Sequence, residues 1–180
     1  DLHAYVRRQR QMCIRDSRDR TYKPTMSVVR YRSKKGIEMA FVYDKNTQYL
    51  EGMNEFGIGI LNSTMLNEVD SDVEDGYNRE QGAIVFKALN TRSLDEAIGV
   101  LTTQSGGLEG HTMVADAARA FHIEMLKGSE AHTTQLDPTT GWDARTNHGM
   151  FFPEGGYMPS DGDFYICLLY TSPSPRDLRA

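Results

Sequence analysis

The stretch SVVRYRSKKGIEMAFVYDKN (27–46) predicts two β-strands joined by a turn, and it sets the fold class. The segment SKKG (33–36) supplies the turn, because a glycine within a short polar run favours chain reversal. Residues typical of strands stand on both sides of it: Val28, Val29, Met39, Phe41 and Tyr43. We therefore expect an antiparallel strand pair here.

Two further stretches repeat this pattern. TQYLEGMNEFGIGILNSTM (47–65) predicts a strand, a turn at residues 54–57 and a second strand through Ile58, Ile60 and Leu61. Its glycines, Gly57 and Gly59, indicate a crowded backbone or a bulge. HTMVADAARAFHIEML (111–126) predicts another hairpin, which turns at residues 116–119.

Two helices are expected between these strand pairs. In residues 79–93 the apolar side chains follow helical spacing, and Asn90 ends the pattern. Residues 94–107 predict a second helix, with Ser93 as N-cap, Glu96 completing a capping box, and two glycines (106–107) at its end. The order of strands, two helices and strands predicts an α+β fold with an antiparallel sheet.

The acidic stretch LNEVDSDVEDGYNRE (66–80) is expected to be a solvated loop. Its aspartates resemble those of calcium loops, but an EF-hand needs a glycine at the sixth position. Counted from Asp70, that position is Asp75, so the pattern fails.

The two ends of the chain are expected to derive from a sequencing adapter. One allowed coding of Met12 to Ser17 has a reverse complement that encodes Cys-Leu-Leu-Tyr-Thr, which is the sequence at 167–171. Transposon-based adapters leave such complementary flanks on both sides of an insert. Residues 1–17 and 167–180 are therefore set aside as adapter-derived, and 18–166 is interpreted as a fragment of a single domain.

Charge and hydropathy exclude several classes of function. Without the two ends the formal net charge is −8, from 14 basic and 22 acidic residues, which disfavours nucleic acid as a partner. No apolar run is long enough for a membrane span, and no secretory signal is present, which favours a cytoplasmic location. Both cysteines, Cys13 and Cys167, lie in the excluded ends.

Sequence patterns for catalysis or metal binding are weak. The histidines of the insert, which are His111, His122, His132 and His148, show no i, i+4 pair and no neighbouring cysteine. We therefore expect neither a metal nor a cofactor. His122 alternates with apolar residues in its strand, so it is expected to be a surface histidine or a hydrogen-bonded core histidine.

Four stretches together resemble the linear amide C–N hydrolases. They are RDRTYKP (18–24), EGMNEFGIGILNSTM (51–65), GHTMVADAARAFHIE (110–124) and ARTNHG (144–149). This family includes penicillin V acylases, bile salt hydrolases and the acyl-CoA:6-aminopenicillanic acid acyltransferases of peptidase C45 type. The resemblance implies the N-terminal nucleophile (Ntn) hydrolase fold, a four-layer αββα sandwich that is incomplete here.

The resemblance also implies a mechanism and its residues. A cysteine at the mature N-terminus attacks the carbonyl of a small-molecule amide or acyl-CoA substrate, with its own amino group as base. Asp19 matches the aspartate that holds this amine, although the preceding arginine of the family's Arg-x-x-Asp pattern is replaced by Asp16. Asn147 matches the asparagine that stabilises the oxyanion, and Asn62 matches a second asparagine used by the bile salt hydrolase branch.

The nucleophile itself is expected upstream of Arg18. Cys13 lies only six residues before Asp19, too close for the first strand and turn of the family. The polypeptide as it stands is therefore expected to be inactive.

Each candidate residue also has a simpler interpretation. Asp19 could form a surface ion pair with its neighbouring arginines, Asn147 could be a turn residue, and Asn62 could cap the end of a strand. Asn54 is expected to be the turn residue of its hairpin. The alternative for the whole chain is a non-enzymatic α+β binding or structural module, in which the acidic loop 66–80 would be the partner surface.

Overall fold

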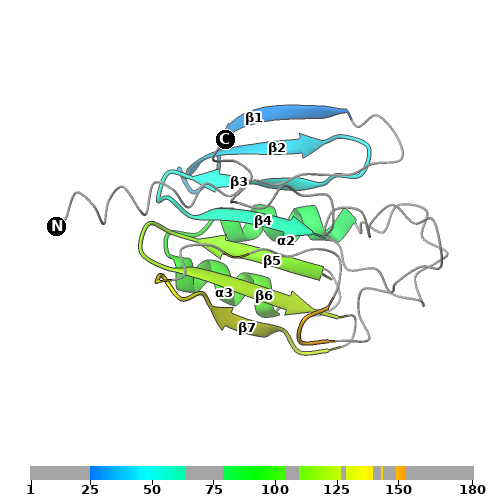
Figure 1. The fold of residues 1–180 in the computed structure, drawn as a ribbon. Coiled ribbons are helices and arrows are strands. Elements are labelled where there is room, and N and C mark those ends of the chain that lie inside the picture. The colour runs from blue at the N-terminus through cyan, green and yellow to red at the C-terminus, as the bar shows by residue number, and fades with distance from the viewer. Residues whose placement is uncertain are drawn as a thin grey trace, which may run out of the picture.

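The computed structural model describes residues 25–63, 79–103, 110–126, 129–139, 143 and 149–152. Within them the chain forms one seven-stranded antiparallel sheet and two helices, which confirms the α+β class (Figure 1). Both excluded ends, the acidic segment 66–78, Asp19 and Asn147 lie outside the described residues. None of the described helices is long and apolar enough to cross a membrane.

The order of the strands across the sheet is their order along the chain. Every strand is antiparallel to its neighbours. The strands are β1 (Met26–Arg32), β2 (Glu38–Asp44), β3 (Leu50–Asn54), β4 (Gly59–Ser63), β5 (Gly110–Ala115), β6 (Ala120–Met125) and β7 (His132–Gln135). The first six are the strands predicted from the sequence, whereas β7, an exposed and polar HTTQ segment, was not predicted.

Side chains at the turns explain where the hairpins reverse. In the first turn, Ser33 Oγ accepts from the backbone N–H of Ile37 at 3.2 Å, and Gly36 has a φ of +82°, which favours glycine. In the turn between β5 and β6, Asp116 Oδ1 accepts from the backbone N–H groups of Ala118 and Arg119, both at 2.8 Å. These are local contacts from a serine hydroxyl and an aspartate carboxylate to the backbone, which favour turns over continued strands.

Of the two alternatives predicted for Gly57 and Gly59, the crowded backbone was wrong, and the bulge stays a prediction. A Cβ at either position would meet nothing within 4 Å among the described residues, and Gly57 instead supplies a φ of +78° to the turn. The crowded position is Gly52 in β3, where a Cβ would lie 2.5 Å from the Cα of Phe41. The glycine that lies against a neighbouring strand is therefore in β3, not in the turn or in β4 as the sequence pattern indicated.

Two helices separate β4 from β5, as predicted: α2 (Arg79–Leu89) and α3 (Leu94–Thr103). The predicted end of the second helix at residues 106–107 lies outside the described residues. Ser93 caps α3, because its Oγ accepts from the backbone N–H of Glu96 at 3.3 Å. The carboxylate of Glu96 reaches back to the backbone N–H of Arg92 at 3.1 Å, one residue beyond the usual partner in a capping box.

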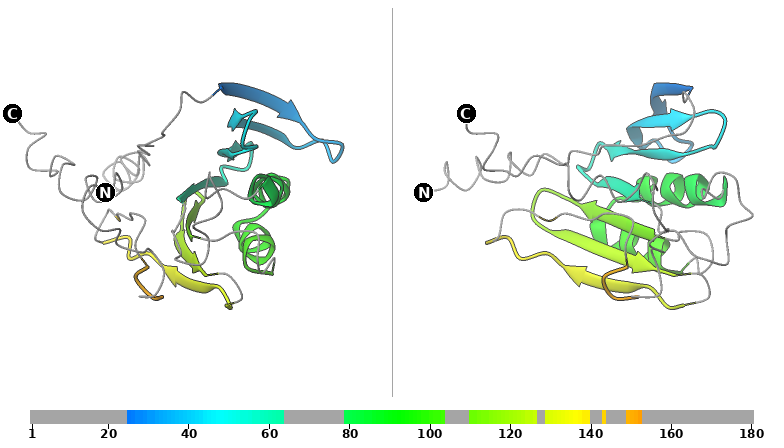
Figure 2. Two further views of the ribbon diagram at one scale, coloured as in Figure 1. Left: turned by 90° about the vertical axis from the view of Figure 1, so that its right-hand side faces the viewer. Right: turned by 45° about the vertical axis from the view of Figure 1, so that its right-hand side comes forward.

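Both helices pack on the same face of the sheet (Figure 2). The core between helices and sheet contains Phe41, Leu50, Ile60, Val85, Leu89, Leu101, Val114 and Ile123, among other buried apolar residues. Strand alternation directs the intervening residues to the opposite face, called the second face below, which carries Leu61, His111, Met113, His122 and Glu124.

Candidate functional site

Four polar residues lie side by side across the second face. The strand register pairs Ser63 of β4 with His111 of β5, His111 with Glu124 of β6, and Glu124 with His132 of β7. Residues directly opposite each other in antiparallel strands have side chains on the same face. The register therefore brings together residues that are up to 69 positions apart in the sequence, from Ser63 to His132.

Two buried histidines are neighbours here: His111 belongs to this row, and His122 lies beside it on β6. His111 Nδ1 and His122 Nε2 are 2.9 Å apart, and the two rings are stacked with centroids 5.0 Å apart. Their exposed fractions are 2% and 3%. A hydrogen bond at this distance requires that one of the two nitrogens carries a proton and the other offers a lone pair.

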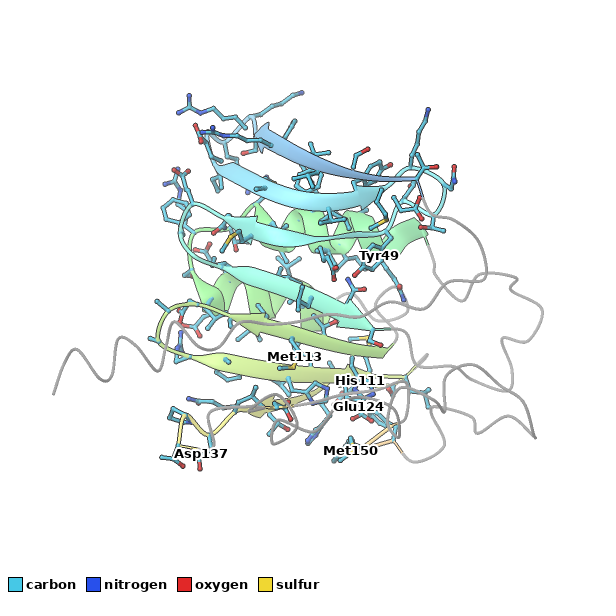
Figure 3. The ribbon with its side chains drawn as sticks, turned by 45° about the horizontal axis from the view of Figure 1, so that its top comes forward. Tyr49, His111, Met113, Glu124, Asp137 and Met150 are labelled. Carbon is cyan, nitrogen blue, oxygen red and sulfur yellow. The ribbon has the colours of Figure 1, made fainter. Side chains whose placement is uncertain are left out.

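Glu124 is the third member of the cluster and is only 1% exposed. Its carboxylate accepts hydrogen bonds from three consecutive backbone N–H groups, those of Met150, Phe151 and Phe152, at 2.8–3.0 Å. One carboxylate oxygen lies 3.8 Å from His111 Nδ1. Figure 3 shows His111 and Glu124 on neighbouring strands, with Met150 close to Glu124.

The pKa of Glu124 reflects two opposing effects. Burial by itself raises the pKa of the carboxyl, but the three backbone N–H groups and the nearby His111 lower it, and the net direction is downward. Backbone donors stabilise the charged form without contributing a titratable group of their own. Glu124 is therefore an anion held in the interior by the segment it binds.

The segment 149–152 is fixed to the sheet at a second point. The ring of Phe151 stacks on His132 of β7, with centroids 3.5 Å apart and planes 6° from parallel. Phe151 also contacts Phe152 edge to face at 5.0 Å. The backbone contacts to Glu124 and this ring contact together hold the segment against β6 and β7.

One of the three predicted site residues lies among the described residues. Asn62 lies near the end of β4, opposite Thr112. It alternates with Ser63, so its side chain points to the helix face and not to the second face that carries the polar row. Its side-chain Nδ2 donates to the backbone carbonyl of Leu50 at 3.2 Å, beyond the last regular pairing of β3 with β4. Asp19 and Asn147 lie outside the described residues, so the predicted convergence of the three remains a prediction.

The cluster of His111, His122 and Glu124 was not predicted from the sequence. Metal ligands were expected as i, i+4 pairs on a helix or beside cysteines, whereas these side chains meet across a hairpin. The signal was available in the predicted hairpin 111–126: a turn at residues 116–119 places position 111 opposite position 124. Among the described residues, this cluster is the group that could hold a cation, since its donor atoms all lie within 4.8 Å of one another.

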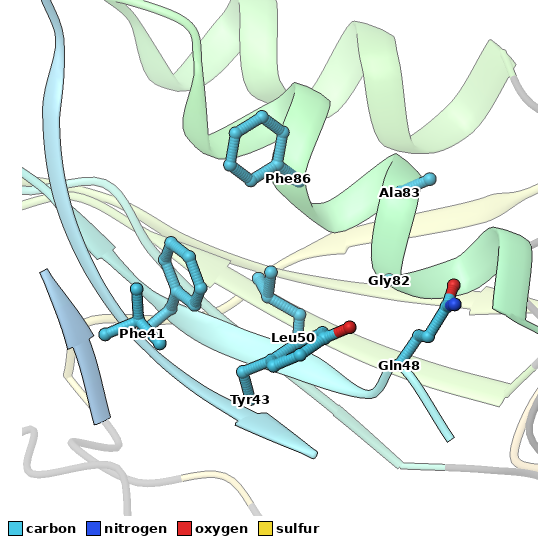
Figure 4. Close-up of a pocket in the computed structure, with 8 residues that line it drawn as sticks. Phe41, Tyr43, Gln48, Leu50, Gly82, Ala83 and Phe86 are labelled. Carbon is cyan, nitrogen blue, oxygen red and sulfur yellow. The ribbon is translucent and has the colours of Figure 1, made fainter. Parts of the chain in front are cut away.

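A pocket on the other side of the sheet has a different character. It lies between α2 and the strands β1 to β3, with a volume of about 460 Å³ (Figure 4). Its lining is mainly apolar and includes Phe41, Leu50 and Phe86, with Gln48 among the few polar contributors. No carboxylate or imidazole belongs to its described lining, so it offers hydrophobic contact and no acid–base group.

Comparison of the chain with family models, with curated proteins and with solved structures gave no match.

Proposed function

We propose that the domain belongs to a cysteine-nucleophile amide (C–N) hydrolase or acyltransferase of the Ntn superfamily. The observation that carries the proposal is the attachment of residues 150–152 to Glu124. Met150 follows Asn147 by three residues in the sequence. The chain next to the motif RTNH is therefore held on the second face, at the end of the sheet where the motif ILN carries Asn62, whose side chain projects to the helix face.

The arrangement of layers supports the same proposal. An αββα sandwich needs sheets that carry helices on their outer faces and meet through their inner faces. Here α2 and α3 both pack on one face of a seven-stranded antiparallel sheet. In the proposed fold this helix–sheet pair is one half of the sandwich, and the second face is the inner one.

The proposed mechanism uses the residues as follows. A cysteine upstream of Arg18 attacks the substrate carbonyl, and Asp19 holds the amino group that accepts the thiol proton. The side-chain amides of Asn62 and Asn147 donate to the tetrahedral oxyanion. The intermediate then expels the amine or thiol of the substrate, which takes the proton from the N-terminal ammonium group, and water or an acceptor amine cleaves the resulting acyl-cysteine thioester. The hydrogen bond from Asn62 Nδ2 to Leu50 fixes the orientation of that amide before substrate arrives.

The test is to recover the coding sequence upstream of Arg18 and to assay the extended protein on N-acyl amides and acyl-CoA thioesters. We expect turnover that iodoacetamide abolishes. Asn62→Ala and Asn147→Ala are each expected to lower kcat by about 10²–10³ without unfolding the protein, because each removes one oxyanion donor.

Asn46→Ala is the matched control, since Asn46 is an exposed asparagine in the turn between β2 and β3. Its kcat is expected to equal that of the parent protein. An extended protein that has no cysteine upstream, or one whose turnover survives both asparagine substitutions, would contradict the proposal. In that case the binding-module interpretation would stand.

A further inference from the structure

We propose that His111, His122 and Glu124 form a binding site for a divalent transition-metal ion of the zinc class. The proposal does not rest on the proposed function, because thiol-based amide hydrolysis needs no metal. It rests on the chemistry and the position of three side chains from the hairpin of β5 and β6.

The donor set suits this class of ion. Two imidazoles and one carboxylate form a mixed nitrogen and oxygen set that binds zinc and neighbouring first-row metals. Such three-ligand sets leave one coordination position for water or another small ligand. With both histidines neutral and Glu124 ionised, the site carries one negative charge to meet the dication.

The distances need only small adjustments. Zinc–ligand bonds of about 2.0–2.1 Å in a tetrahedron place the ligand atoms roughly 3.3 Å apart. The separations found here are 2.9 Å between His111 Nδ1 and His122 Nε2, and 3.8 Å between His111 Nδ1 and Glu124. All three donor atoms lie within 4.8 Å of one another. Side-chain movements on the order of 1 Å would bring them around one ion.

The surroundings hold the ligands in place. The backbone N–H groups of residues 150–152 orient the carboxylate of Glu124 and keep it ionised inside the protein. Such outer contacts fix ligand geometry at metal sites. The strand register fixes the remaining relation, since His111 is opposite Glu124 and His122 lies two residues before Glu124 on the same strand.

Metal binding would change the protonation of the histidine pair. At present one nitrogen of the short contact carries a proton, and a metal requires lone pairs on both. That ring must move its proton to its other nitrogen, and a ring protonated on both nitrogens must release one proton. Binding is therefore expected to weaken as the pH falls.

The experiment uses the full chain with Cys13 and Cys167 replaced by serine, because free thiolates would also bind zinc. The protein is stripped with a chelator and titrated with Zn²⁺ by calorimetry and with Co²⁺ by visible absorption. We expect one equivalent of either metal to bind, and Zn²⁺ to raise Tm. His111→Gln and His122→Gln are each expected to weaken binding by more than the roughly 10–100-fold that is typical of an outer-shell partner.

His132→Gln is the matched control, because His132 lies on the same face but outside the cluster. It should bind Zn²⁺ as tightly as the parent. If the glutamine variants at 111 or 122 do not fold, ring-nitrogen NMR of the parent decides: Zn²⁺ should shift the signals of His111 and His122 and leave that of His132 unchanged. The proposal is overturned if no saturable one-to-one binding occurs, or if His132→Gln weakens binding as much as the cluster variants. Neither result bears on amide hydrolysis.

Discussion

At the scale of single residues, Glu124 links two parts of the chain that are distant in sequence. It is buried, charged and bound to three backbone N–H groups from a distant segment. Hydrogen bonds to a charged group contribute more to stability than bonds between neutral groups. Leaving a buried donor or acceptor without a partner lowers the free energy of unfolding. Glu124 thus joins the hairpin of β5 and β6 to residues 150–152.

Glu124→Gln tests this role through its pH dependence. The folded-state pKa of Glu124 is lowered, so its contribution to stability is complete above the ordinary value of 4.5 and is lost as the pH falls through the lower folded-state pKa. At neutral pH we expect the substitution to reduce the free energy of unfolding by about 1–3 kcal/mol. Below pH 4.5 the difference from the parent should shrink, as measured by urea unfolding across pH.

The exposed Glu130 provides the comparison. Glu130→Gln should change the free energy of unfolding by less than about 0.5 kcal/mol at any pH. A difference for Glu124→Gln that stays constant from neutral to acid pH would show that lost packing, and not lost charge, explains the destabilisation.

Sequence reasoning could not foresee this residue. A glutamate at the end of FHIE has the polar character of a solvent-facing position, and its burial depends on a segment more than 20 residues later. His111 and His122 are similar: each is a lone histidine within its strand, and only the register unites them. Asn62 was singled out through a resemblance, not through a local pattern.

At the scale of elements, the turn between β3 and β4 is tied to the end of helix α2 by one side chain. Asn54 Nδ2 donates to the carbonyls of Leu89 and Thr91 at 2.8 and 2.9 Å. Its Oδ1 accepts from the N–H groups of Phe56 and Ile58 at 3.0 and 3.1 Å. The prediction that Asn54 is a turn residue is confirmed, and the structure adds its role at the helix end.

Asn54→Ala is expected to lower the free energy of unfolding by at least about 2 kcal/mol, because it leaves buried carbonyl and N–H groups without this partner. Chemical denaturation monitored by circular dichroism measures the change. Asn54→Asp should be no better, since it removes the amide donors and adds a negative charge at a helix C-terminus. If Asn46→Ala costs as much, the bridge between turn and helix has no special importance.

The sheet also tests the difference between a crowded and an open glycine. Gly52→Ala would press a methyl group onto the backbone of Phe41 on the neighbouring strand, whereas Gly59→Ala meets no described atom within 4 Å. We expect Gly52→Ala to cost about 1–3 kcal/mol or more through overpacking. Gly59→Ala should be within about 0.5 kcal/mol of the parent in the same thermal or urea unfolding assay. Equal costs would contradict the steric explanation.

The predicted helices and strands were confirmed where the local sequence pattern and the local contacts agree. The first hairpin and the two helices combine periodic apolar residues with turn or cap residues, such as Gly36 and Ser93, and they fold as predicted. Strand β7 has no apolar period: within the described part of the chain it pairs with β6 alone, and its four residues are largely exposed. Its formation depends on pairing with β6, and the local sequence of β7 gives no sign of that pairing.

At the scale of the whole molecule, the two faces of the sheet differ in chemistry, and α2 and α3 cover one of them. The helix face holds the apolar core and the apolar pocket, while the second face holds the histidines and Glu124. The α+β class follows from the order of elements. Which face the helices cover depends on which face carries the apolar side chains of all the strands together. The four-layer sandwich remains a prediction.

The order of the strands has a consequence for how the protein folds. Each strand pairs with the next one along the chain, so nearly all pairings close short loops, and such local closures are fast. The exception is the pairing of β4 with β5, which must wait for residues 64–109 to be drawn together. The boundary between β4 and β5 therefore divides the sheet into two parts. We expect strands β1–β4 and β5–β7 each to form early as separate meanders, and their joining at Ser63 and His111 to be the slower step that completes the polar row.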